Sequence, residues 1–389
     1  MSKTIIIIGA GLAGLSAALQ AAENGCNVKL VSSLPSERAQ SVMAEGGINA
    51  ALNTKDENDS PEEHFTDTIK AACGLADPNA VWGMTQAAPE LVHWLLKLGV
   101  KFNMSGYDDV DLRNFGGQKK KRTAFAQSDT GKQIMTAMID AVRRKEASGM
   151  VERFSHHSFL TLRLCGNICC GCVIRDEYSQ ETVELPGDAV IVATGGMHGL
   201  FGNTTGSLSN TGEVTAELFR LGVPLANGEM IQYHPTTVKC GGKRMLISEA
   251  ARGEGGRLFA MKDGKQWYFM EEKYPELGNL MPRDITAREI WKVSHESEVF
   301  LDMTEISEEI ISNKLSGLAD DCMTYLHKDI RKEPVSVLPG IHYFMGGILV
   351  DEQHRTPIQN LYAAGECCAQ YHGANRLGGN SLLGALYGG

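Results

Sequence analysis

The chain has 389 residues, of which 43% are hydrophobic and 22% charged. This is the composition of a globular protein, and the length predicts two domains rather than one. A formal net charge of −10 argues against a nucleic-acid surface. No apolar run approaches the ~20 residues that span a bilayer, and a predicted strand begins too early to leave room for a signal peptide, so we expect no direct membrane insertion.

The first predicted elements form a βαβ unit. Residues 4–8 are typical of a strand buried on both faces, residues 15–24 of an Ala-rich helix, and residues 27–31 of the next strand. Between strand and helix lies a G-x-G-x-x-G motif at 9–14, whose glycines allow a tight turn, close approach of a pyrophosphate and close helix packing. The unit predicts a bound dinucleotide, although Ser32 and Ser33 stand where an acidic residue usually binds the ribose.

Two clusters in the first half receive structural interpretations. The basic run from Lys119 to Arg122 is interpreted as a solvated loop. Four cysteines lie around a glycine-containing turn between two apolar runs, which predicts a hairpin with reduced, buried thiols rather than a metal site. They are Cys165, Cys169, Cys170 and Cys172. We therefore predict no bound metal.

Two later strands return to the predicted dinucleotide site. Residues 189–196 form a buried strand that ends in glycines, and residues 361–366 repeat this pattern. The expected fold is α/β, with a Rossmann-like domain of residues 1–231 and 344–389 and an inserted α+β capping domain of residues 232–343. His234 and His342 stand at the edges of the insertion, where a site between two domains would draw its residues.

Six segments follow one another in the order found in the succinate dehydrogenase, fumarate reductase and L-aspartate oxidase flavoproteins. They are residues 45–51 (EGGINAA), 232–236 (QYHPT), 248–256 (SEAARGEGG), 282–284 (PRD), 342–347 (HYFMGG) and 372–382 (HGANRLGGNSL). The chain resembles this family over nearly its whole length. The resemblance implies an FAD-dependent enzyme that moves a hydride to or from a C4-dicarboxylate.

The residues expected at FAD come from the glycine motif, from the ends of the later strands and from the resemblance. They are Gly9, Ala10, Gly11, Ala13, Gly14, Ser32, Ala44, Glu45, Gly46, Gly47, Ala193, Thr194, Gly195, Glu213, Glu366, Ser381 and Leu382.

A substrate with a carboxylate at each end needs cationic and hydrogen-bonding groups to hold both ends. By resemblance, His342 and Arg376 would hold one carboxylate, while His234, Ser248 and Glu249 would surround the other.

The resemblance makes Arg283 the proton donor or acceptor, supplied through Glu249 and Arg252. General chemistry alone would not choose arginine, because its guanidinium normally stays protonated. The sequence would look the same if Glu249 and Arg252 formed only a buried structural ion pair.

The chain departs from the family pattern at several positions. Gln40 stands where membrane-complex members carry a flavin-linking histidine, so we expect noncovalent FAD with a lower potential, which favours fumarate reduction. Ala39 replaces a serine and Glu213 an aspartate, which weakens local contacts only. Family members continue through a further helical region after the position of residue 382, which this sequence lacks, so we expect a chain that is either truncated or unusually short. That region commonly faces the iron–sulfur subunit in the family, so this departure bears most on the prediction of an iron–sulfur partner.

The sequence leaves three functions open. The leading one is a fumarate or succinate oxidoreductase with an iron–sulfur partner, which the loop at 115–118 favours; we expect it in the cytoplasm, with partner subunits able to hold it at the inner face of the membrane. L-Aspartate oxidase, which forms iminoaspartate, is the second, and Gln40 favours it slightly. A non-catalytic flavin-binding protein is the third.

Overall fold

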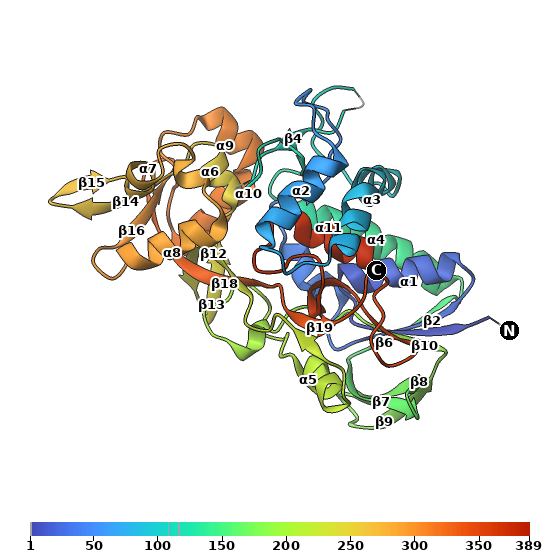
Figure 1. Ribbon diagram of the computed structural model, residues 1–389. Coiled ribbons are helices and arrows are strands. Elements are labelled where there is room, and N and C mark those ends of the chain that lie inside the picture. Colours follow the sequence, from blue (N-terminus) through green and yellow to red (C-terminus); the bar gives the residue numbers. More distant parts are fainter. Residues whose placement is uncertain (1, 108, 116) are drawn as a thin grey trace.

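The computed structural model describes residues 2–107, 109–115 and 117–389, and it has two lobes (Figure 1). The larger lobe holds both termini. The smaller lobe contains much of the sequence between about 232 and 343, drawn in yellow to orange, and projects away from the termini. The α/β fold class predicted from the sequence is confirmed, because a parallel sheet with packed helices forms the larger lobe.

The larger lobe is built on a five-stranded parallel sheet with strand order β20-β10-β1-β2-β6. The strands are β1 (Thr4–Ile8), β2 (Asn27–Ser32), β6 (Val151–Ser155), β10 (Ala189–Val192) and β20 (Leu361–Ala363). In this register Ile8 lies beside both Val31 and Val192, and Val192 beside Ala363. The C-terminal ends of these four strands, which come from three separate parts of the sequence, are thereby brought to one edge of the sheet.

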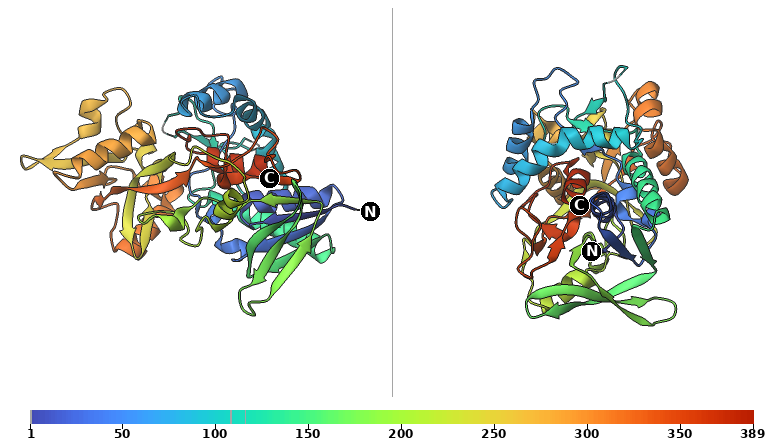
Figure 2. Two further views of the ribbon diagram at one scale, coloured as in Figure 1. Left: turned by 60° about the horizontal axis from the view of Figure 1, so that its bottom comes forward. Right: turned by 90° about the vertical axis from the view of Figure 1, so that its right-hand side faces the viewer.

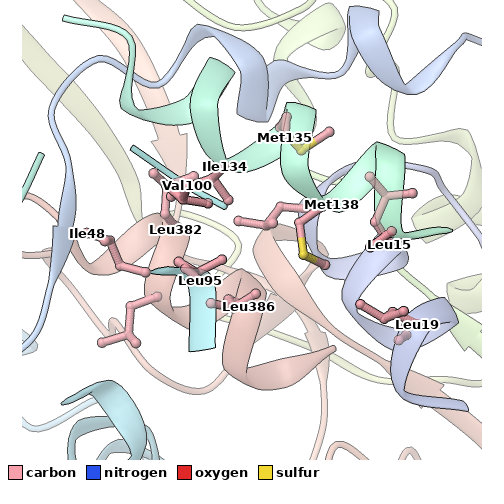
Figure 3. Packing of buried hydrophobic residues seen from close by; sticks show 14 of the residues in the cluster. Leu15, Leu19, Ile48, Leu95, Val100, Ile134, Met135, Met138, Leu382 and Leu386 are labelled. Carbon is pink, nitrogen blue, oxygen red and sulfur yellow. The ribbon is translucent and has the colours of Figure 1, made fainter. Parts of the chain in front are cut away.

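Different layers cover the two faces of this sheet. Ile7 and Leu30 pack against α1 (Leu12–Glu23), α4 (Thr130–Ala147) and α11 (Asn380–Gly388), in the core of Figure 3. Ile6 and Ile8 point to the opposite face. There they meet the antiparallel sheet of β7 (His157–Cys165), β8 (Ile168–Asp176) and β9 (Thr182–Pro186), drawn in green in Figure 2.

Two capped helices complete the outer layer. Ser60 accepts a hydrogen bond from the Glu63 amide at the start of α2 (Pro61–Ala71), and Asp77 caps α3 (Pro78–Lys97) in the same way. Both begin with proline, whose missing N–H costs nothing at the first helical position. The remaining elements of this lobe are β3 (Ile48–Asn49), β4 (Leu112–Arg113), β5 (Thr123–Ala124), α5 (Glu213–Arg220), β11 (Leu225–Ala226), β19 (Gly347–Leu349) and β21 (Cys368–Ala369).

The smaller lobe has its own hydrophobic core, with Leu258, Ile290 and Leu301 among its buried residues. Two antiparallel sheets build it, β13-β12-β18 and β15-β14-β16-β17. The strands are β12 (Ile231–Cys240), β13 (Lys243–Leu246), β14 (Arg257–Lys262), β15 (Lys265–Trp267), β16 (Val299–Asp302), β17 (Val335–Ser336) and β18 (Leu338–Phe344). The helices are α6 (Glu249–Gly253), α7 (Phe269–Lys273), α8 (Arg283–Val293), α9 (Glu308–Lys314) and α10 (Ser316–Asp321). The exact domain bounds stay a prediction.

The interpretation of residues 119–122 as a solvated loop is wrong for Arg122. Its side chain is fully buried and forms ion pairs with Asp59 and Asp67 at 2.8 and 2.9 Å. A charge run could not reveal this, because the two carboxylates come from a segment about sixty residues earlier. Within the described ranges, no helix is long and apolar enough to cross a bilayer.

The G-x-G-x-x-G glycines make the sheet and α1 pack closely. A Cβ on Gly14 would lie 1.9 Å from the Gly9 carbonyl oxygen, and one on Gly9 would lie 2.3 Å from the Ala193 carbonyl oxygen. Gly9 also has φ +111°, which disfavours other residues.

We predict that Gly14→Ala lowers the free energy of unfolding by about 1–3 kcal/mol, because the added methyl group must push β1 and α1 apart. Denaturant unfolding measures this loss. Gly202→Ala is the control, because a Cβ there meets no atom within 4 Å. Equal stability of the two variants would contradict the close packing.

Candidate active site

One continuous cavity runs from the glycine motif to the seam between the lobes. At its first end it is lined by Gly9, Ala10, Gly11, Ala13, Ser32, Ala44, Glu45, Gly46, Gly47, Ala193, Thr194, Gly195, Glu213, Glu366, Ser381 and Leu382. At the seam it is lined by His234, Ser248, Glu249, Arg283, His342 and Arg376. Gly14 and Arg252 are the residues predicted from the sequence that lie outside this lining; Gly14 packs α1 on β1, and Arg252 lies behind Glu249.

The first end of the cavity suits a dinucleotide. Gly11, the residue before α1, has no side chain to cap the helix, and the first helical residues Leu12 and Ala13 line the cavity, although the Leu12 amide itself donates to Ser41. Such a terminus attracts phosphate. The buried Ser32 hydroxyl, at the end of β2, has no hydrogen-bond partner within the described structure. These features fit the pyrophosphate and a ribose of FAD.

Two residues that were not predicted from the sequence support the dinucleotide end of the cavity. Arg113 donates to the carbonyl oxygens of Glu45 and Gly46 at 3.0 and 2.9 Å, and its guanidinium lies 4.2 Å from the Phe125 ring centre. It thereby holds the 45–47 segment in place. Ser41 accepts a hydrogen bond from the Leu12 amide at 3.3 Å. No motif marked Arg113, because its partners are backbone atoms far away in the sequence.

Gln232 joins two cationic side chains at the seam. Its amide oxygen accepts hydrogen bonds from Arg283 at 3.1 Å and from Arg376 at 2.9 Å, while its amide nitrogen donates to the Arg376 carbonyl oxygen at 2.7 Å. Gln232 is buried. The sequence placed it inside the QYHPT segment, but nothing there indicated that one amide orients both guanidinium groups.

Glu249 is the counterion of this cluster. Its Oε2 accepts from Arg283 Nε and Nη2 at 2.8 and 2.6 Å, and its Oε1 lies 3.4 Å from Arg252 Nη2. Burial lowers the pKa of Arg252, and it lowers the pKa of Arg376 to about 9, where the charge of Arg283 adds to the effect. The guanidinium groups of Arg252, Arg283 and Arg376 outnumber the single carboxylate of Glu249. The cluster therefore carries excess positive charge, which favours a bound anion.

Two neutral imidazoles face this cluster. The rings of His234 and His342 have centres 5.2 Å apart, and His342 Nδ1 is 2.9 Å from the Thr205 hydroxyl. Burial, followed by the charge of Arg283, lowers the pKa of both histidines well below the usual range. They therefore offer hydrogen bonds rather than charge at neutral pH.

Hydrogen bonds from side chains elsewhere in the larger lobe hold the loop that carries Arg376. Asn49 donates to the Gly378 carbonyl oxygen at 2.8 Å and to Asn380 Oδ1 at 2.7 Å, and Gln118 donates to the same carbonyl at 2.9 Å. The Arg376 guanidinium itself lies 4.4 Å from the centre of the Tyr343 ring. Of the predicted loop at 115–118, Gly116 lies outside the described residues.

Glu45 is a partly buried acid of the cavity wall, with its carboxyl oxygen Oε2 fully buried and its side chain hydrogen-bonded to Ser248 of the seam. Burial, and to a lesser extent Asp321, raises the pKa of Glu45 to about 8, while a hydrogen bond with the Ser248 side chain opposes the shift. The carboxyl is therefore mostly protonated at pH 7. No group of three or more His, Cys, Asp or Glu side chains that could hold a metal ion occurs in the part of the chain that the structure describes.

We predict that Glu45→Gln becomes progressively more stable than the parent as the pH rises from 5 to 8. The unfolded carboxyl ionises near its ordinary pKa of 4.5, whereas the folded one stays protonated to about pH 8. The parent alone therefore loses about 1.4 kcal/mol of stability per pH unit in this range.

Unfolding measured across this pH range tests the prediction. Glu62→Gln is the control, because the pKa of Glu62 is lowered, chiefly by a hydrogen bond from its own backbone, and its variant should not gain relative stability. A difference between Glu45→Gln and the parent that does not change with pH would contradict the raised pKa.

Known proteins resemble this chain over its whole length. The FAD binding domain family matches residues 4–382. The succinate dehydrogenase flavoprotein subunit of Bacillus subtilis (strain 168) is 45% identical over 396 residues, covering 100% of this chain and 68% of that protein. The L-aspartate oxidase of Streptomyces coelicolor is 34% identical and covers 98% of this chain and 67% of its own length.

A solved structure agrees with these relatives. A point mutant of the flavoprotein FrdA of Escherichia coli quinol fumarate reductase superimposes with a TM-score of 0.91 at 30% identity. The match covers 100% of this chain and 68% of that one. The chain thus spans about two thirds of the length of each of these proteins.

Proposed function

This chain belongs to the family of FAD-dependent succinate dehydrogenase and fumarate reductase flavoproteins, and we propose that it transfers a hydride between FAD and a C4-dicarboxylate. The observation that carries the proposal is the pair of guanidinium groups, Arg283 and Arg376, that share the Gln232 amide oxygen beside two neutral histidines. A dicarboxylate would neutralise the excess charge of this cluster. When bound, FAD would supply the hydride for fumarate reduction or accept it from succinate.

The two ends of the substrate would be held by different groups. Arg376 would bind one carboxylate with His342, whose ring is oriented by Thr205. His234 and Ser248 would hydrogen-bond the other carboxylate. This arrangement fixes the central carbons between the carboxylates, close to the dinucleotide end of the cavity, and such positioning is a large part of catalysis.

Arg283 would give the proton that fumarate reduction requires on the carbon next to the one that receives the hydride. Glu249 lies 2.6 Å from Arg283 Nη2, close enough to return a proton, and Arg252 would supply Glu249 from behind. In succinate oxidation the same groups would carry the proton away. We assign no direction in the cell.

FAD is proposed to be noncovalent. Gln40 lines the cavity within the turn Gln40–Met43, and an amide has no ring nitrogen that could form a flavin link. An iron–sulfur subunit is the proposed electron partner, because several relatives are named as subunits of larger enzymes. Such a partner would hold the protein at the cytoplasmic face of the membrane.

Arg283→Ala should bind a dicarboxylate but lose the proton donor. The test is to reduce the purified flavoprotein anaerobically and follow the return of the oxidised flavin spectrum after fumarate is added. We expect a rate at least ~10²-fold below that of the parent, as for loss of a general acid. Arg288→Ala is the matched control on the same helix, because Arg288 is exposed.

Equal rates for Arg283→Ala and the parent would overturn the proton-donor role. Turnover with L-aspartate but not with succinate would instead identify an L-aspartate oxidase. If FAD binds but none of these dicarboxylates changes its redox state, the protein is a non-catalytic flavin-binding protein.

Acid precipitation tests how FAD is held. All of the flavin should remain in the supernatant, since no covalent bond ties it to the denatured chain. Flavin that stays in the washed pellet and appears on a tryptic peptide would contradict noncovalent binding.

A further inference from the structure

The β7–β8 hairpin carries two thiols in direct contact. The Sγ atoms of Cys165 and Cys170 are 2.7 Å apart, about 0.7 Å longer than a disulfide bond. Cys165 is exposed and Cys170 is partly exposed. The hairpin itself was predicted from the sequence, but the interpretation of all four cysteines as buried thiols is correct for Cys169 and Cys172 only.

A β-bulge brings these two thiols together. Leu162 pairs with Cys172 and Leu164 with Cys169, so three steps on β8 oppose two steps on β7. Gly171 permits the bulge with φ +139°, and a Cβ there would lie 2.1 Å from the Leu185 carbonyl oxygen. The extra residue turns Cys170 toward the Cys165 side of the hairpin, where its Sγ also lies 3.4 Å from the Arg163 carbonyl oxygen.

The neighbouring thiols are poor candidates for the same chemistry. Cys169 and Cys172 are fully buried, and burial raises the pKa of Cys172 to about 12. A buried, protonated thiol reacts slowly, because the thiolate is the nucleophile. Cys165 is exposed whereas Cys170 is only partly exposed, so a small disulfide reaches Cys165 first.

We propose that Cys165 and Cys170 form a reversible dithiol–disulfide site that reacts with small disulfides such as oxidised glutathione. The Cys165 thiolate attacks one sulfur of the small disulfide and releases one small thiol. The Cys170 thiolate then attacks Cys165 in this mixed disulfide, forms the Cys165–Cys170 bond and releases the second small thiol. Two protein thiols lose two electrons and two protons, and the small disulfide gains both.

The site has a structural connection to the cofactor end of the cavity. The hairpin tip is held on residues 357–360, since the Asn167 side chain donates to the Pro357 carbonyl oxygen at 3.0 Å and the Cys169 amide donates to the Gln359 carbonyl oxygen at 2.8 Å. This segment continues into β20 and then Glu366, which lines the cavity. The other end of β7 lines the cavity at residues 157–159. Closing the ring would fix the bulge between these two contacts.

Peptide mapping of the full chain tests the proposal without any measurement of flavin activity. The chain is equilibrated with oxidised glutathione and denatured, its remaining thiols are alkylated, and it is digested with trypsin. Cleavage after Arg163 and Arg175 places all four hairpin cysteines in one peptide. We expect this peptide to carry one disulfide and two alkylated cysteines, with fragment ions locating the bond between positions 165 and 170.

Two variants separate this pair from its neighbours. Cys165→Ser should abolish the disulfide, because the remaining partly exposed thiol then has no partner in contact. Cys172→Ala should keep it, and circular dichroism checks that both variants are folded. Four alkylated cysteines, a glutathione adduct that never closes the ring, or a disulfide that survives in Cys165→Ser would each overturn the proposal.

Discussion

The site depends on the burial of like charges around a few shared acceptors. Arg283 and Arg376 would repel each other, yet both donate to the Gln232 amide oxygen, and Glu249 binds Arg283 and approaches Arg252. Buried guanidinium groups are costly unless they are paired and hydrogen-bonded. A bound anion of matching shape would lower the remaining free-energy cost of burying these positive charges. The arrangement that destabilises the fold would therefore also provide affinity for the substrate.

Residues from both lobes are needed to hold these groups. Gln232 and His342 lie on neighbouring strands of the smaller lobe, β12 and β18, whereas Arg376 comes from the loop before α11 in the larger lobe. Asn49 and Gln118 fix that loop through the Gly378 carbonyl oxygen. The register of β12 against β18 and the hydrogen-bonded loop together set the distance between His234 and the pair of His342 and Arg376, which would set the substrate length that fits.

Most of the fold and many residues of the site could be predicted from the sequence, because they lie in short motifs. The glycines at 9–14 and the buried strands can be recognised from neighbouring residues alone, because steric needs fix the glycine spacing and burial fixes the pattern of apolar residues. Residues that act through distant partners could not be found in this way. Arg122 looked like part of a solvated run, Arg113 binds backbone atoms, and Gln232 received no role although it orients two arginines. The contact between Cys165 and Cys170 depends on a bulge that no residue pattern indicated.

A crystal structure of the chain with FAD and succinate bound would test the central claim most directly. The account predicts one succinate carboxylate within hydrogen-bond distance of Arg376 and His342, the other beside His234 and Ser248, and the central carbons between Arg283 and the flavin ring. A succinate that binds elsewhere, or that leaves Arg283 and Arg376 bonded only to protein atoms, would contradict it.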